Sequence, residues 1–88
     1  MDLDRAWDLH PKVSVRPEPF GALLYHFGTR RLSFLKDRTL LAVVESLSTS
    51  STARDACDAA GVSEPDLPRY ERALETLAAS SMVVERAA

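Results

Sequence analysis

Residues 21–35 read GALLYHFGTRRLSFL, two apolar runs on either side of a Gly-Thr pair. Glycine at the first central position of a two-residue turn tolerates a positive φ, so residues 28–29 suit a type II′ hairpin turn. Counting outward from that turn places Leu23 opposite Phe34. The stretch therefore predicts an antiparallel hairpin.

The two faces of this hairpin differ in the size of their side chains. We expect the bulkier set to face the core, namely Leu23, Tyr25, Leu32 and Phe34. We expect the more mixed set to face solvent or a partner, namely Leu24, His26, Arg31 and Ser33. A register slip of one residue would exchange the two faces.

An earlier strand is predicted where Lys12 to Arg16 alternates polar and apolar residues with a period of two. Pro17 and Pro19 are expected to end this strand, because proline has no N–H for the ladder. The final residues 82–84 are predicted to form a last strand or a packed tail.

Three helices are predicted after residue 36. Asp37 is the expected N-cap of the first helix, and Ser51 is the expected cap of a second helix that runs through Ala60. Gly61 follows where a left-handed helix terminus favours glycine. A third helix is predicted from the region of the two prolines at 65–68. Its apolar stripe consists of Leu67, Tyr70, Leu74 and Leu77.

The order of these elements predicts an α+β, winged-helix-like fold, in which a three-stranded antiparallel sheet is followed by three helices. The 88 residues are expected to form a single domain, with residues 1–10 as a loosely held lead-in.

Composition and charge exclude several functions. The 11 basic and 13 acidic side chains lack the positive excess typical of nucleic-acid-binding domains, so we do not expect nucleic acid as a partner. A winged-helix DNA-binding regulator remains the alternative. No apolar run approaches the roughly 20 residues that span a bilayer, so no membrane partner is expected. The single cysteine and the absence of a secretory signal favour the cytoplasm.

Catalysis is not expected from this chain. His10 and His26 are far apart in the sequence, and Cys57 is typical of a small packing residue. Neither a metal site nor a glycine-rich phosphate loop is apparent, so no cofactor is predicted.

Binding of an extended peptide is a better hypothesis. The strand 31–35 is expected at the edge of the sheet, where free amide and carbonyl groups can accept another strand. The alternative is that Arg30, Arg31 and Lys36 only keep this edge soluble. The sequence pattern alone leaves both explanations open.

A family resemblance favours the binding hypothesis. Residues 16–27, RPEPFGALLYHF, continue into GTRRLSFL, and the chain from about Trp7 to Val83 resembles the PqqD-like recognition elements of ribosomally made, modified peptides. Within that family it is most similar to the mycofactocin chaperones. The resemblance implies that the third strand and third helix bind a precursor peptide. It also implies a radical S-adenosylmethionine (SAM) maturase as a partner, and this enzyme carries the cluster and S-adenosylmethionine.

We therefore expect the backbone of Arg31, Ser33 and Leu35 to hold the peptide and basic residues to attract acidic peptide residues. The maturase is expected to contact the first two helices or the N-terminal arm. The full set of expected peptide-binding residues is Arg30, Arg31, Leu32, Ser33, Phe34, Leu35, Arg69, Tyr70 and Arg72.

Overall fold

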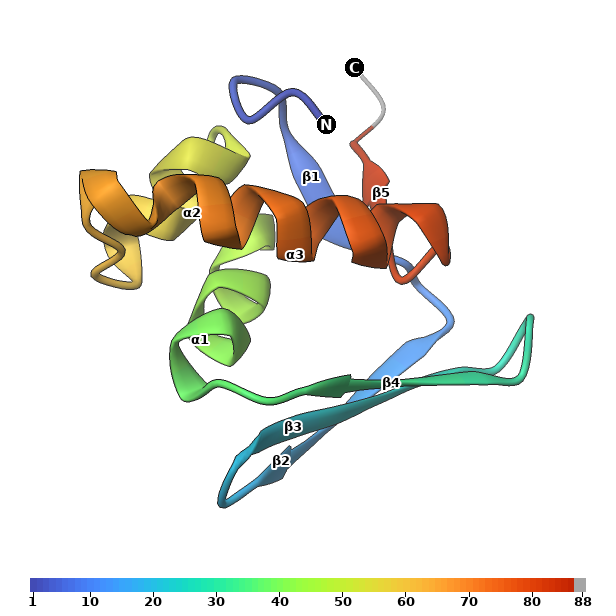
Figure 1. Ribbon diagram of the computed structural model, residues 1–88. Helices are drawn as coiled ribbons and strands as arrows, with labels where there is room; N and C mark the ends of the chain where they lie inside the picture. The colour runs from blue at the N-terminus through green and yellow to red at the C-terminus, as the bar shows by residue number, and fades with distance from the viewer. Residues whose placement is uncertain (87–88) are drawn as a thin grey trace.

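The computed structural model describes residues 1–86 and has the predicted α+β fold (Figure 1). A three-stranded antiparallel sheet has the order β2 (Val13–Glu18), β3 (Gly21–His26), β4 (Arg31–Leu35). It is followed by three α-helices: α1 (Arg38–Ser46), α2 (Ala53–Ala59) and α3 (Leu67–Ala79). Short 3-10 turns, η1 (Leu47–Thr49) and η2 (Glu64–Asp66), precede α2 and α3. A small second sheet, which the sequence did not reveal, pairs β1 (Trp7–Leu9) with β5 (Val83–Glu85).

The helices lie on one side of the large sheet. Figure 1 shows α1 and α3 above one face of β2–β4, with the β1–β5 pair beyond α3 and the other face of the sheet uncovered. The helix α1 contacts β3 and β4, and α3 contacts β5. Within residues 1–86, no helix has the length and apolar character needed to cross a bilayer.

The hairpin register is confirmed, although its turn is of a different kind. Leu23 pairs with Phe34 as predicted. The positive φ, however, is at Arg30 (61°) and not at the glycine of the turn. Residues 27–30 form a four-residue connection in which the Arg30 N–H donates to the His26 carbonyl at 2.7 Å. A two-residue loop and a four-residue loop that are both centred between residues 28 and 29 give the strands the same register. The pairing could therefore be predicted correctly although the turn type was not.

The predicted core face of the hairpin is wrong. Leu24 is fully buried, whereas Leu32 and Phe34 are exposed. The chain leaving β4 explains the inversion, because it passes close to Gly21: a Cβ there would lie 2.9 Å from the amide nitrogen of Asp37, the N-cap of α1. The small residues at the start of β3 therefore let α1 approach the face that also carries Leu24. Side-chain size pointed to the other face, which no helix covers.

His26 lies on this buried face and organises the turn. Its Nδ1 accepts hydrogen bonds from the N–H groups of Gly28 at 3.0 Å and Thr29 at 3.1 Å. Its ring lies against His10, with 4.4 Å between the ring centroids. Nε2 has no hydrogen-bond partner within the described part of the chain. The expectation that His26 faces solvent or a partner is therefore wrong, because the ring is buried and its Nδ1 accepts hydrogen bonds from the backbone of the loop.

Element boundaries differ from expectation in two places. The strand β2 continues through Pro17, which pairs with Ala22; proline is compatible with β2 because this is an edge strand. The second helix is capped by Thr52, whose hydroxyl accepts from Asp55 N–H at 3.1 Å, and not by Ser51. Gly61 has the left-handed φ expected of it, at 84°.

Residues 1–10, expected as a loose lead-in, contact the core. Leu3 is 4 % exposed, and β1 pairs with β5 in the register that sets Leu9 opposite Val83. Each of these strands has three residues, which is too short for a period-two pattern to be recognised. Their pairing depends on residues about 75 positions apart in sequence.

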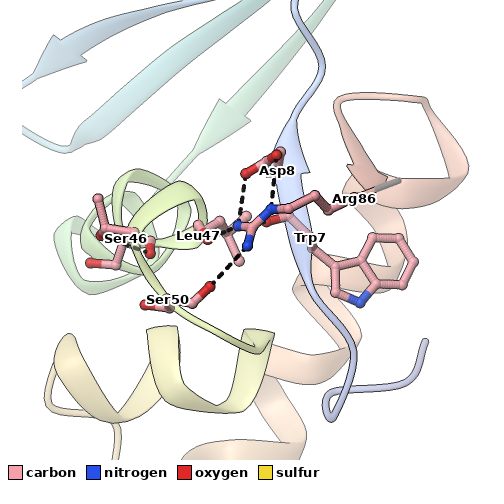
Figure 2. A network of polar contacts seen from close by, with 7 residues as sticks. Trp7, Asp8, Ser46, Leu47, Ser50 and Arg86 are labelled. Carbon is pink, nitrogen blue, oxygen red and sulfur yellow. Dashed lines mark hydrogen bonds and ion pairs between the residues drawn. The ribbon is translucent and has the colours of Figure 1, made fainter. Parts of the chain in front are cut away.

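Arg86 connects this small sheet to the end of α1 through hydrogen bonds of its guanidinium (Figure 2). Its guanidinium forms a bidentate pair with the Asp8 carboxylate, at 3.1 and 3.0 Å. It also donates to the carbonyl oxygens of Leu47 at 2.7 Å and Trp7 at 3.2 Å. Leu47 is the C-cap of α1, so the cation satisfies a helix-end carbonyl and interacts favourably with the helix dipole.

Replacement of Gly21 by alanine is expected to lower the free energy of unfolding by at least about 3 kcal/mol, because a φ of 153° and the close Leu35 carbonyl both oppose a Cβ. Gly61→Ala is the matched control. Gly61 has a positive φ with open space around it, so its loss should be about 1 kcal/mol. Urea unfolding measures both variants, and equal losses would contradict the proposed close approach at Gly21.

Candidate functional site

An apolar cleft of about 320 Å³ lies between β4 and α3, with α1 at one end. Its volume is at the lower end of the range of roughly 300–1,000 Å³ found for ligand pockets. The lining residues are mostly apolar, and they come from all three elements: Ser33, Phe34, Leu35, Leu40, Ala73, Thr76 and Leu77. This cleft lies where strand addition was predicted.

The strand β4 forms the edge of the sheet beside this cleft, and no strand of residues 1–86 pairs with its other side. The Leu35 carbonyl points toward β3, since it lies against Gly21. Backbone groups alternate in direction along a strand, so those of Ser33 also face β3 while those of Leu32 and Phe34 face the open edge. The expected backbone donors Arg31, Ser33 and Leu35 are therefore committed to the sheet.

The spacing of the two cleft walls is fixed at Asp37, the residue that joins β4 to α1. Its carboxylate accepts from Thr39 N–H at 2.7 Å as the predicted N-cap, and it also accepts from the Tyr70 hydroxyl of α3. Arg69 completes the cluster: it donates to the Tyr70 oxygen at 2.9 Å and lies 3.6 Å from the Asp37 carboxylate. The Arg69 guanidinium also stacks over the Tyr70 ring, 4.9 Å from its centroid.

This cluster lowers the pKa of Asp37 below its usual value. The hydrogen bond from Tyr70 is the main cause, and the backbone N–H groups of Thr39 and Leu40 and the charge of Arg69 act in the same direction. Partial burial opposes the change. Tyr70 is 5 % exposed, so this side chain and that of Arg69 hold α3 against the β4–α1 junction.

The other residues of the predicted set fall into two groups. Arg30 and Arg31 are exposed at the tip of the β3–β4 hairpin, while Arg72 is exposed on α3 outside the cleft lining. Ser33, Phe34 and Leu35 line the cleft, and Leu32 is exposed beside them on β4.

The third helix was predicted to form one wall of the groove, but the residues of α3 that line it were not identified from the sequence. Ala73 and Thr76 are three residues apart and flank the apolar stripe of the helix. Small side chains beside such a stripe are the signal that could have indicated a groove. Leu77 belongs to the predicted apolar stripe of the third helix, and both Leu40 and Leu77 are largely buried.

A larger hollow of about 450 Å³ lies between α2 and the start of α3. Its walls include the charged residues Arg54, Asp55, Asp58 and Glu64, and no strand edge borders it. Nearby Cys57 is buried, and burial raises the pKa of its thiol, as is typical of an unreactive packing residue. We therefore assign the candidate site to the smaller cleft.

The substitution Asp37→Asn keeps an N-capping side chain but removes the charge. It should lower the free energy of unfolding at pH 7 by about 1 kcal/mol. Because the folded pKa of Asp37 lies below the unfolded value, its contribution is present above about pH 4 and is lost as the pH falls further. Urea unfolding between pH 2 and pH 7 should show a weaker acid destabilisation in the variant. Identical pH profiles, or full additivity with Tyr70→Phe, would contradict the coupling.

Comparison with known proteins identifies the family. Residues 6–84 match the peptide chaperone MftB family. Peptide chaperone MftB of Mycobacterium tuberculosis is 61 % identical over 85 residues, which cover 97 % of this chain and 78 % of that protein. The Mycobacterium ulcerans protein of the same name is 60 % identical, with 99 % and 80 % covered. No solved structure gives a significant match. Chaperone is a non-catalytic role, in agreement with the absence of catalysis expected from the sequence. This chain belongs to the peptide chaperone MftB family.

Proposed function

We propose that this chain is a non-catalytic chaperone that binds the mycofactocin precursor peptide as an added strand on β4 and presents it to a radical SAM maturase. The observation that carries the proposal is the open edge of β4 next to an apolar cleft. Strand addition needs both features: backbone groups for affinity and a pocket for alternate side chains.

The backbone of Leu32 and Phe34 supplies the hydrogen bonds to the peptide. Side chains of the added strand then alternate between the two faces of the sheet. One set enters the cleft between Leu35 and Thr76, where apolar side chains are favoured. The other set lies on the opposite face of the sheet, beside Leu32 and Phe34.

Charge assists the encounter with the peptide. Arg30, Arg31 and Arg72 are exposed, and none forms an ion pair within residues 1–86. They attract acidic peptide residues and raise the association rate more than the final affinity. Arg69 contributes less to this attraction, because it is already held by Asp37 and Tyr70.

Isothermal titration with the precursor peptide tests the proposal. We expect one-to-one binding with a dissociation constant of about 1 μM or tighter, or roughly −8 kcal/mol. Leu32→Pro removes an outward N–H and should weaken binding at least about tenfold. The matched control Leu32→Ala keeps the N–H and should stay within about threefold. Absence of binding by the unaltered chain would refute the function, and equal losses in the two variants would refute strand addition.

A bulky side chain in the cleft should compete with the peptide. Thr76→Trp places an indole in the lining and is expected to weaken peptide binding at least about tenfold, because the pocket for alternate side chains is filled. Ala79→Trp, on an exposed position of α3 outside the lining, is the control and should bind normally. Thermal unfolding checks that both variants fold. Normal affinity of Thr76→Trp would mean that the peptide does not use this cleft.

A further inference from the structure

The most exposed apolar side chains of this protein gather on the large sheet. Within residues 1–86, four large apolar side chains are about half exposed or more, and all four lie on β4 or in the turns of the two hairpins: Phe20 at 48 %, Phe27 at 61 %, Leu32 at 55 % and Phe34 at 60 %. None lies on α1, α2 or the N-terminal arm. Contiguous exposed apolar surface of this kind is typical of an interaction site.

Five of the exposed or half-buried side chains form one surface, which we call the outer face: Leu23, Tyr25, Phe27, Leu32 and Phe34. The strand register sets Leu23 beside Phe34 and Tyr25 beside Leu32, on the side of the sheet opposite buried Leu24. The rings of Tyr25 and Phe27 meet edge to face, with 4.9 Å between their centroids. Aromatic side chains held on strands bury a large apolar area at a small entropic cost, so they suit the centre of an interface.

Basic residues are concentrated in the part of the chain that forms the large sheet, and Arg16 lies beside Leu23 of the outer face. The segment from residue 12 to residue 38 carries six basic and two acidic side chains, whereas the rest of the chain carries five basic and eleven acidic ones. Both acids of the segment are already paired, Glu18 with Arg16 at 2.8 Å and Asp37 with Tyr70 and Arg69. The surface that complements this face is therefore apolar at its centre and acidic at its border.

A second copy of the chain does not fit this description. Two-fold pairing of the outer face with itself brings the same patch of each copy together, so its basic border would meet an equally basic border. Like charges placed together across an interface are repulsive. The charge pattern thus favours a different protein as the occupant.

We infer that the outer face is the docking surface for the maturase, which must present an apolar patch bordered by carboxylates. This inference rests on the proposed function. A peptide strand added to β4 extends the sheet, and its outward side chains continue the surface of Leu32 and Phe34. An enzyme docked on the outer face therefore touches the chaperone and its bound peptide together. The first two helices and the N-terminal arm, one of which was expected from the sequence to make this contact, do not border β4 on this side (Figure 1).

The test measures two affinities for each variant: that for the purified maturase, by biolayer interferometry, and that for the precursor peptide, by calorimetry. Phe27→Ser alters the outer face away from the β4 edge, and Tyr25→Ser alters its neighbour. Both should weaken maturase binding at least about tenfold and leave peptide affinity within about twofold. Phe20→Ser, the same chemical change in the β2–β3 turn at the far end of the sheet, should change neither affinity. Thermal unfolding checks that all three variants fold.

The possible results separate this inference from the proposed function. Maturase affinity that stays within twofold in Phe27→Ser and Tyr25→Ser, while peptide still binds, overturns the docking surface and leaves the chaperone role intact. An equal loss in Phe20→Ser also overturns it, because the effect would not be specific to the outer face. Light scattering should show a monomer; a dimer that Phe27→Ser dissociates would assign the face to a second copy. Failure of the unaltered chain to bind peptide would instead refute the proposed function.

Discussion

A single carboxylate, that of Asp37, sets the relation between the sheet and the helices. Because it caps α1 immediately after β4 and accepts from Tyr70 of α3, it ties three elements together at one point. The cleft exists between β4 and α3 because this junction holds them at a fixed separation while small residues such as Ala73 leave space beside it. The shape of the cleft thus follows from an N-cap carboxylate that accepts a second hydrogen bond, from Tyr70 of α3.

Features with local causes could be predicted from the sequence. The hairpin register, the Asp37 cap and the Tyr70–Leu77 stripe each depend on residues a few positions apart. The core face of the hairpin could not be predicted in this way. Alternation divides the side chains between the two faces of the sheet but does not show which face the helices cover. The path of the chain after β4 determines which face is buried, because it brings α1 over Gly21 and Leu24. That is a tertiary constraint with no signature in side-chain size.

The sequence predicted the elements that form the candidate site, one strand and one helix, more accurately than the individual residues that line it. β4 and α3 do form the two walls. Tyr70 was expected to bind the peptide, and the structure shows that its hydroxyl donates a hydrogen bond to Asp37. The outward direction of the Leu32 and Phe34 backbone depends on which residues pair through hydrogen bonds, and spacing alone does not determine it. Arg86 was missed because its partners at residues 7, 8 and 47 are remote in sequence.

The pairing of β1 with β5 has a practical consequence for engineering. It is extended by a hydrogen bond of 2.8 Å from the Arg86 N–H to the Ala6 carbonyl. The β1–β5 pair lies on the side of the molecule remote from the large sheet (Figure 1). A tether attached near either strand leaves the β4 edge unobstructed, so this protein is well suited to covalent linkage with a second chain. Such a linkage would replace bimolecular encounter by a high effective concentration without altering either binding surface.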